Sequence, residues 1–574
     1  MSYAHDGSGQ FNLWSSPALG GWPTQLTSFE ENAARHHAWT SWGLLVGVDH
    51  HGDEMWQLNL VPAEGGWPKD LTRSPSHRHE MAGKVLSDDG ERLCFSANRS
   101  SPTDMGIHVL HIREGRVQPV LEEPGNWYAT AWHPDGKHLL AIKQNSNTDL
   151  DVYLLDLPGG RTRLLTPHDG EEVNAGIGFA ADGSGIYRLT DSGHEFRWLA
   201  FQPITGGPLR EIVKADWDVE HAALSADRRR MAFTLNENGI STFHVIDLEG
   251  SRELPVPDLP RGACLQFAFS PDGNRIAAVI GSGARTFDLY VADLPRQTAV
   301  RVTQSFLGGV PEAELVEPEV VHIPAFDGRS IPAWLYRPKL RGAGTGALLS
   351  IHGGPEAQER PGHSFSFYQY LLSRGVAILA PNIRGSTGYG ISYQRLIHRD
   401  WGGDELKDIE TCAKYLQDLD WVDPGRLAVY GGSFGGFATL SAMTRLPHYW
   451  ACGVDVVGPS NLVTFAKAVP PHWRAMMAQW VGDPFSEVDF LMARSPITYV
   501  DQVTAPLMVL QGAMDPRVVK AESDQMVERL LALGREVEYH VFDDEGHGFT
   551  KRSNQQRAMK LASDFVFTHL RVEG

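Results

Sequence analysis

A turn centred on an aspartate recurs at a nearly constant spacing, and this recurrence restricts the fold of the first half of the chain more than any other feature. The central aspartates are Asp89, Asp135, Asp182, Asp227 and Asp272, and successive members are 46, 47, 45 and 45 residues apart. Each turn is followed by strand-like segments in which apolar and polar residues alternate. A period of about 45 residues with four short strands per repeat is typical of a β-propeller blade.

A blade of four strands buries neither face alone, so blades must stack around an axis. Six full repeats run from about residue 33 to 306, and strand-like pieces at residues 10–14 and 22–27 resemble half of another repeat. We therefore expect a propeller of about seven blades, one of them incomplete, over residues 1–312. A solenoid or a β-sandwich is the alternative.

From about residue 313 the pattern changes to strands that alternate with helices. Apolar strands are expected at residues 347–351, 376–380, 427–430, 453–457, 507–510 and 536–541, with amphipathic helical stretches such as residues 406–416 between them. Alternating strands and helices predict a mostly parallel sheet covered on both faces. We expect this second domain to span residues 313–574.

The candidate nucleophile is Ser433, which stands in a G-x-S-x-G pattern between an apolar strand and an apolar helix. A sharp strand-to-helix turn lifts a serine out of the fold, and the flanking glycines let neighbouring backbone pass closely. A Gly-rich loop with an ordinary surface serine would show the same pattern.

Loops after two later strands supply the partners that such a serine needs. Asp515 and His547 follow Ser433 in the order of an α/β-hydrolase triad. His547 would take the proton and Asp515 would orient the imidazole. Asp543 and Asp544 are rivals for the acid, but they share the histidine's own loop. A surface histidine and a turn-capping aspartate are the alternatives.

An oxyanion needs two N–H donors. We expect one from the backbone of Phe434, directly after the serine, and one from the backbone of Gly354 in the run His352-Gly353-Gly354-Pro355. Whether His352 itself has more than a structural role stays open.

Four motifs together resemble the prolyl oligopeptidase family of serine peptidases, and the resemblance covers the whole chain. The motifs are Gly-Gly-Ser-Phe-Gly-Gly around Ser433, His-Gly-Gly-Pro at 352–355, Asn-Ile-Arg-Gly-Ser-Thr-Gly-Tyr-Gly at 382–390 and Asp-Pro-Arg-Val at 515–518. The His-Gly-Gly-Pro run resembles the acylaminoacyl-peptidase branch. A tyrosine that other branches use in the oxyanion hole has no clear counterpart here.

The resemblance implies an α/β-hydrolase domain behind a propeller that admits short peptides and excludes folded proteins. It implies that Arg517 binds a substrate carbonyl or carboxylate, with a structural ion pair as the alternative. It places the pocket for the residue before the cut after Val457, where Phe465, Trp473 and Trp480 offer apolar walls. Core packing explains these aromatic residues equally well.

Composition excludes several classes of partner. The net charge of −19, from 51 basic and 70 acidic residues, disfavours nucleic acid and anionic lipid. Four widely spaced cysteines without a C-x-x-C pair indicate reduced thiols in a cytoplasmic protein, and we expect no metal and no cofactor. No apolar run approaches the length of a membrane span, and no secretory signal is visible.

The leading hypothesis is a serine peptidase that hydrolyses short peptides, N-acylated ones among them, through an acyl-enzyme. A dipeptidyl peptidase would need a carboxylate pair for the substrate amine, and Glu122-Glu123 and Glu171-Glu172 are the pairs on offer. A carboxylesterase would share every catalytic residue. A non-enzymatic interaction protein built on the propeller is a further class. Homo-oligomer formation and the route by which substrate enters stay open.

Overall fold

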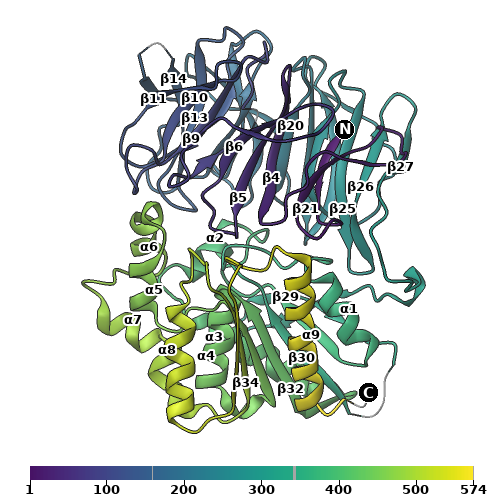
Figure 1. The fold of residues 1–574 in the computed structure, drawn as a ribbon, viewed down its shortest axis with the longest axis vertical. Coiled ribbons are helices and arrows are strands. Elements are labelled where there is room, and N and C mark those ends of the chain that lie inside the picture. Colours follow the sequence, from purple (N-terminus) through teal and green to yellow (C-terminus); the bar gives the residue numbers. More distant parts are fainter. Residues whose placement is uncertain (84, 158, 341–343, 573–574) are drawn as a thin grey trace.

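The chain forms a propeller that lies on one end of an α/β domain (Figure 1). The computed structural model describes residues 1–83, 85–157, 159–340 and 344–572. In the figure the N-terminal strands lie in the upper body and the C-terminal helix lies in the lower one. Among the described residues, no helix combines the length and the apolar character needed to cross a bilayer.

Over the residues that the structure describes, the propeller consists of seven antiparallel sheets, which we number as blades 1–7 in chain order. Blade 1 holds β1 (Ser2–His5), β2 (Asn12–Ser15) and β3 (Thr24–Gln25), and blade 2 holds β4 (Asn32–Thr40), β5 (Gly43–His50), β6 (Gln57–Val61) and β7 (Lys69–Asp70). Blade 3 holds β8 (His79–Glu80), β9 (Arg92–Ala97), β10 (Gly106–His111) and β11 (Arg116–Leu121), and blade 4 holds β12 (Asn126–Trp132), β13 (His138–Gln144), β14 (Leu150–Asp156) and β15 (Arg161–Leu164). Blade 5 holds β16 (Asn174–Phe179), β17 (Gly185–Thr190), β18 (Trp198–Pro203) and β19 (Arg210–Val213), and blade 6 holds β20 (Val219–Leu224), β21 (Arg230–Glu237), β22 (Ile240–Asp247) and β23 (Arg252–Leu254). Blade 7 holds β24 (Ala263–Phe269), β25 (Arg275–Ser282), β26 (Arg285–Asp293) and β27 (Thr298–Arg301).

The predicted blade count is confirmed, with six blades of four strands and one of three. The repeating aspartate lies in the turn between the first and second strands of blades 3–7. In blades 3, 6 and 7 its carboxylate accepts a hydrogen bond of 2.5–2.6 Å from the hydroxyl of a serine two residues earlier, at Ser87, Ser225 and Ser270. A side chain that caps its own turn in this way explains why aspartate recurs there.

One of these turns carries an arginine where the others carry glycine. Gly90, Gly136, Gly183 and Gly273 have φ between 64° and 72°, and Arg228 of blade 6 takes φ 58° at the equivalent position. Its Nη2 lies 2.7 Å from Oδ2 of Asp88, in the corresponding turn of blade 3. Because blades 3 and 6 are not neighbours, this ion pair crosses the propeller axis. The opposite set of turns faces the α/β domain, so the pair lies on the remote face of the propeller.

In its described part, the α/β domain contains one eight-stranded sheet in the order β28-β29-β31-β30-β32-β33-β34-β35. Its strands are β28 (Glu319–Pro324), β29 (Ser330–Tyr336), β30 (Thr345–Ile351), β31 (Ala377–Pro381), β32 (Val422–Gly432), β33 (Cys452–Val456), β34 (Leu507–Gly512) and β35 (Val537–Phe542). Strands β30 to β35 pair in parallel, and β28 and β29 are antiparallel. The predicted parallel strands are confirmed within one to three residues at most ends, and β32 begins earlier than predicted.

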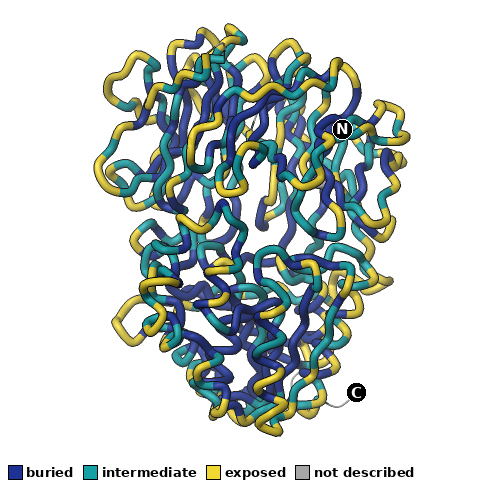
Figure 2. The backbone as a smooth tube through the Cα atoms, turned by 60° about the vertical axis from the view of Figure 1, so that its left-hand side comes forward, coloured by how far each residue is buried: buried dark blue, intermediate teal, exposed yellow. Residues whose placement is uncertain are grey.

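Helices cover both faces of this sheet. They are α1 (Phe365–Ser373), α2 (Ile391–Gln394), α3 (Asp404–Asp418), α4 (Phe434–Arg445), α5 (Leu462–Ala468), α6 (Arg474–Trp480), α7 (Val488–Arg494), α8 (Ala521–Ala532) and α9 (Arg552–His569). Helices α3, α4 and α8 pack on one face, where Leu349 and Ile351 point, and α1 and α9 pack on the other, where Leu348 points. Figure 2 shows buried segments of the backbone in the interior of both domains and exposed segments at the periphery.

The two domains meet through polar contacts. The segment after β30 reaches the propeller, where Asn147 donates to Glu356 at 2.5 Å and Asn236 donates to Gln358 at 2.7 Å. Arg360 of the same segment donates to Gly239 O at 2.9 Å. The predicted boundary at residues 312/313 falls between β27 and β28. These contacts fix the face of the propeller that covers the carboxyl ends of the parallel strands.

Candidate active site

Ser433 stands at the sharp turn between β32 and α4. Its backbone adopts φ 58° and ψ −119°, a conformation that side chains rarely take. Glycines are required on both sides, because a Cβ on Gly431 would lie 2.2 Å from Gly435 O and a Cβ on Gly435 would lie 2.0 Å from Ile351 O. The hydroxyl is therefore presented at the carboxyl end of the sheet, where open α/β sheets bind ligands.

The three residues predicted for the triad lie in contact. His547 Nε2 is 2.9 Å from Ser433 Oγ, and His547 Nδ1 is 2.8 Å from Asp515 Oδ2. The other carboxylate oxygen of Asp515 accepts the N–H groups of Arg517 (2.8 Å) and Val518 (3.0 Å), which hold the side chain in place. Asp515 is fully buried and His547 is 12% exposed. The arrangement can deprotonate the serine hydroxyl.

Of the two rival acids, Asp544 is engaged elsewhere. Asp544 accepts a hydrogen bond from Lys551 Nζ at 2.6 Å and another from Asn554 at 3.1 Å. Lys551 also reaches Glu31 of the propeller at 2.5 Å. Asp544 therefore belongs to an ion-pair network beside the histidine loop, and Asp515 is the carboxylate that contacts the imidazole.

The turn predicted to hold the second oxyanion donor lies beside the nucleophile. A Cβ on Gly353 would be 3.4 Å from Ser433 Cβ, and Gly354 has φ 127°. Phe434 begins α4, and the first N–H groups of a helix have no partner within it. The His352 ring contacts Ser386 Oγ (2.8 Å) and Gly353 O (2.7 Å), so it braces this turn. Burial lowers the pKa of His352.

Arg517 reaches from the α/β domain to the propeller. Its Nε donates to Glu54 Oε1 at 2.7 Å, from the β5–β6 turn of blade 2. Glu54 Oε2 also accepts a 2.7 Å hydrogen bond from Arg78 Nη1, and Arg78 pairs with Glu80. We name Glu54, Arg78, Glu80 and Arg517 the mouth cluster. Its formal charge is zero, and the sequence reasoning missed its three propeller residues.

Two members of the mouth cluster, Glu54 and Arg78, are favoured in their ionised forms, since the pKa of Glu54 is lowered and that of Arg78 is raised. Burial of Glu54 opposes its ionisation, but Arg517 and Arg78 outweigh burial and lower its pKa. The neighbouring His472 has a pKa lowered to about 4, chiefly because it is buried and also because Arg78 is near. This histidine is therefore neutral at physiological pH, and Asn126 of blade 4 donates to its carbonyl oxygen at 2.8 Å.

The predicted pocket residues fall into two environments. Phe465 is 5% exposed and stacks on Trp401 with ring centroids 6.0 Å apart, and Trp401 contacts Phe434 at 4.8 Å. Trp473 lies instead against Arg517, whose guanidinium carbon is 5.3 Å from the centroid of the Trp473 ring. Trp480 contacts Trp401. Trp401 links Phe465 and Trp480 to Phe434, the nucleophile's neighbour, and its position outside the expected pocket segment is why the sequence did not single it out.

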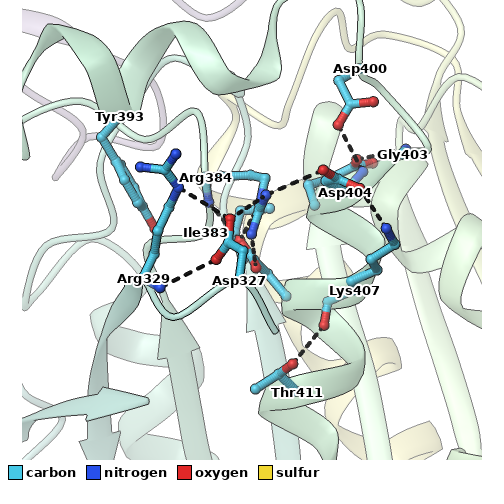
Figure 3. Close-up of polar contacts among 12 residues, drawn as sticks. Asp327, Arg329, Ile383, Arg384, Tyr393, Asp400, Gly403, Asp404, Lys407 and Thr411 are labelled. Carbon is cyan, nitrogen blue, oxygen red and sulfur yellow. Dashed lines mark hydrogen bonds and ion pairs between the residues drawn. The ribbon is translucent and has the colours of Figure 1, made fainter. Parts of the chain in front are cut away.

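The motif at residues 382–390 is held by a buried ion-pair network (Figure 3). Arg384 donates to both carboxylate oxygens of Asp408, at 3.0 and 2.8 Å, and its Nη1 lies 3.3 Å from Asp327. Lys407 pairs with Asp404 at the edge of the same network. These contacts assign Arg384 to positioning its own loop.

The sequence offers two carboxylate pairs for binding a substrate amine, and both lie in propeller loops: Glu122-Glu123 and Glu171-Glu172. Glu122 and Glu123 are exposed in the loop between β11 and β12. Glu171 accepts a hydrogen bond from Thr148 at 2.7 Å and pairs with Arg395 at 3.3 Å, and Glu172 lies 3.8 Å from Arg188. Among the described residues, one group of His and Asp side chains could hold a metal ion, and it lies on blade 4.

The histidine loop packs directly against the propeller. A Cβ on Gly546 would lie 2.1 Å from Gly52 O of the β5–β6 turn, so only glycine fits there. On the other side, a Cβ on Gly512 would lie 2.1 Å from Gly546 O. Arg552 N–H donates to Gly9 O of blade 1 at 3.0 Å. The loop that carries His547 is thus enclosed between the sheet and blades 1 and 2.

Comparison with known proteins agrees with this architecture. Residues 363–573 match the family model described as the prolyl oligopeptidase family. The chain is 36% identical over 259 residues to a dipeptidyl aminopeptidase BIII of Pseudoxanthomonas mexicana, covering 43% of this chain and 37% of that protein. It is 26% identical over 215 residues to an acylamino-acid-releasing enzyme 1 of Oryza sativa subsp. japonica, covering 36% and 27%. These alignments thus span about a third of each relative.

The fold as a whole matches solved structures. A puromycin-hydrolysing peptidase of Mycobacterium tuberculosis superposes with a TM-score of 0.85 at 21% identity, over 99% of this chain and 92% of that chain. This likeness covers the propeller as well as the α/β domain, and it confirms the two-domain architecture.

Proposed function

We propose that this chain is a serine peptidase acting on short peptides, since its residues 363–573 form a hydrolase domain of the prolyl oligopeptidase family. The observation that carries the proposal is the contact of Ser433 Oγ with His547 Nε2 at 2.9 Å, with Asp515 on the far nitrogen at 2.8 Å. Assembled nucleophile, base and orienting acid are what acyl transfer requires.

The reaction would proceed through an acyl-enzyme. Ser433 Oγ attacks the substrate carbonyl carbon while its proton passes to His547 Nε2. Asp515 stabilises the imidazolium, and the backbone N–H groups of Phe434 and Gly354 would stabilise the oxyanion. The imidazolium then gives its proton to the leaving amine as the C–N bond breaks. Water, deprotonated by the same imidazole, cleaves the ester and restores the serine.

The propeller would restrict the substrate to short peptides. It covers the carboxyl ends of the parallel strands, and the Asp88–Arg228 pair crosses its axis on the remote face. A folded protein could not reach Ser433 through such a cover. Comparing the cleavage of a short peptide with that of the same sequence displayed in a loop of a folded protein tests this restriction, and equal rates would contradict it.

N-acylated peptides are the preferred substrate in this proposal, because the mouth cluster already balances its charges internally. A substrate with an acylated N-terminus has no charged amine, so its binding leaves the zero net charge of the mouth cluster unchanged. The acylamino-acid-releasing relative and the His-Gly-Gly-Pro run support the same choice.

A dipeptidyl peptidase is the second candidate, because Glu54 and Glu80 are two carboxylates that both pair with Arg78, and a substrate ammonium could bind between them. The dipeptidyl aminopeptidase relative favours it as well. Neither choice follows from the fold, since both activities use the same catalytic residues.

A fluorophosphonate probe tests the nucleophile. The probe should label the wild-type chain once, at Ser433, and should not label the Ser433→Ala variant. Labelling of that variant at the wild-type level would refute the mechanism. A chain that turns over p-nitrophenyl esters but cleaves no peptide would instead be a carboxylesterase.

Paired substrates separate the two peptidase candidates. Acetyl-alanine p-nitroanilide and a free dipeptide p-nitroanilide should be compared on the wild type and on Glu54→Gln/Glu80→Gln. An amine-binding role raises KM for the free dipeptide alone by about 10²-fold, the value of a lost charged hydrogen bond. Glu122→Gln/Glu123→Gln, which alters an exposed pair, is the matched control and should change neither substrate.

The cytoplasm is the proposed location. Cys94, Cys264, Cys412 and Cys452 are all buried free thiols. Unpaired cysteines are typical of reducing compartments.

A further inference from the structure

The turn between β12 and β13 of blade 4 carries histidines where the equivalent turns of blades 3, 6 and 7 carry serine and arginine. Blades 3, 6 and 7 share a Ser-x-Asp-x-x-Arg pattern, at Ser87–Arg92, Ser225–Arg230 and Ser270–Arg275. Blade 4 has His133, Asp135 and His138 at the same three positions. In blades 3, 6 and 7 the same turn forms with serine and arginine at these positions. The turn therefore does not require histidine.

The three side chains of blade 4 converge on one point. His133 Nδ1 lies 3.0 Å from Asp135 Oδ1, and His138 Nδ1 lies 2.7 Å from Asp135 Oδ2. One nitrogen or oxygen from each residue lies within 4.8 Å of the others. Tetrahedral ligands about 2.1 Å from a metal ion are about 3.4 Å apart, so small side-chain movements suffice to surround an ion.

Both imidazoles are oriented by oxygen atoms outside the cluster. His133 Nε2 is 3.3 Å from Gly183 O of blade 5, and His138 Nε2 is 3.3 Å from Asp156 Oδ1. The backbone N–H of Asp135 donates to His133 Nδ1 at 3.2 Å, so this nitrogen carries its lone pair, and a bound ion would replace that hydrogen bond. An imidazole that turns one nitrogen inward and donates the other N–H to an oxygen is the arrangement that metal-binding histidines adopt.

We propose that His133, Asp135 and His138 form a binding site for a divalent first-row transition ion of the Zn²⁺ type. Two imidazole nitrogens and one carboxylate oxygen suit such ions, and water would complete a tetrahedral shell. Mg²⁺ and Ca²⁺ prefer oxygen ligands alone and are excluded by this donor set. The side chains are 17%, 35% and 33% exposed, so an ion reaches them from solvent.

The ion would fasten blade 4 to blade 5. The His133 ring packs against Phe179 of blade 5, with centroids 4.7 Å apart, and touches Gly183 of the same blade. A metal bond to His133 therefore fixes a side chain that already spans two blades. Since the site lies on the remote face of the propeller, we expect the ion to stabilise the propeller and to leave the chemistry at Ser433 unchanged.

Metal titration of the full-length, tag-free, metal-free chain tests the proposal. Isothermal titration with ZnCl₂ should show one strong site, and CoCl₂ should produce visible absorption bands of a four-coordinate ion. A hundredfold excess of Zn²⁺ over Kd should raise Tm by about 3–5 °C. MgCl₂ should produce none of these changes.

The repeat itself supplies the decisive variant. His133→Ser/His138→Arg gives blade 4 the residues of blades 3, 6 and 7, so it should fold, and it should bind Zn²⁺ at least 10²-fold more weakly. His168→Ala is the matched control, because His168 lies 3.1 Å from Asp149 and 3.6 Å from Asp151 without a second histidine. It should bind like the wild type.

Two results would overturn the proposal. One is a wild-type chain that binds Zn²⁺ no more tightly than 1 mM. The other is equal binding by wild type and His133→Ser/His138→Arg, which would place the ion elsewhere. Asp135→Asn keeps the shape of the turn and provides a second reading, with an expected loss of 10- to 100-fold in affinity. Fluorophosphonate labelling of each variant verifies that the chain is folded.

Discussion

Replacing Gly546 by alanine should reduce catalysis by moving the neighbouring His547. The added Cβ would lie 2.1 Å from Gly52 O, and real Cβ atoms essentially never approach closer than 3.0 Å. The loop and the propeller turn must therefore separate by about 1 Å. The sheet blocks the loop on its other side through the Gly512 contact, so the displacement strains the whole segment.

A shift of this size is large compared with the tolerance of the triad. The contact between His547 Nε2 and Ser433 Oγ would lengthen from 2.9 Å to about 3.9 Å, beyond hydrogen-bond reach. Misplacing a catalytic group by about 1 Å costs on the order of 10²-fold in rate. We therefore expect Gly546→Ala to lower kcat and the rate of fluorophosphonate labelling by about 10²-fold.

Gly548→Ala is the matched control on the other side of the histidine. Gly548 has φ 101° and nothing within 4 Å of an added Cβ, so this change strains the backbone without a clash. Its effect on labelling should be at least tenfold smaller than that of Gly546→Ala. Wild-type labelling by Gly546→Ala, in a chain with an unchanged melting profile, would refute the claim that the propeller turn holds the histidine loop.

Three further outcomes are expected. Asp515→Asn should lower kcat by about 10⁴-fold with little change in KM, measured with a p-nitroanilide substrate, because the asparagine would favour the wrong imidazole tautomer. Burial raises the pKa of Glu359 from 4.5 to about 8, so the native state binds this proton more tightly than the unfolded state, and the stability it contributes is lost as pH rises through about 8. In urea titrations Glu359→Gln should therefore gain stability relative to wild type by a few kcal/mol between pH 5 and pH 9, and a constant difference would contradict this. Arg228→Gly should leave the free energy of unfolding within about 1 kcal/mol of wild type, since relief of a strained φ offsets the lost ion pair, whereas Asp88→Asn keeps the strain and should be the less stable of the two.

The sequence predicted the elements that rest on local patterns. The spacing of the turn aspartates gave the blade count, because each aspartate caps its own turn and the requirement repeats with every blade. The strand–glycine–helix pattern located Ser433, since the elbow cannot form without Gly431 and Gly435. The order of the loops then identified Asp515 and His547.

Features that depend on docking were not predictable. The partner of Arg517 is Glu54, 463 residues earlier, and nothing in either segment indicates that the β5–β6 turn reaches the acid loop. The sequence predicts no metal site, because its four cysteines are widely spaced and form no C-x-x-C pair. The cluster on blade 4 becomes visible only when the repeats are aligned residue by residue. Its histidines are then the departure from the pattern.

The ion pair between Asp88 and Arg228 connects two non-neighbouring blades across the centre of the propeller. A propeller of seven blades can deform by becoming oval or by opening between two blades. An ion pair between opposite blades opposes both motions on the face where it lies, which here is the face remote from the α/β domain. The opposite face is held instead by its contacts with the α/β domain, such as those of Arg360 with Gly239 and Arg517 with Glu54. Because this ion pair is partly exposed, raised salt concentration should weaken it, and the remote face of the propeller should become more mobile before the face that contacts the α/β domain.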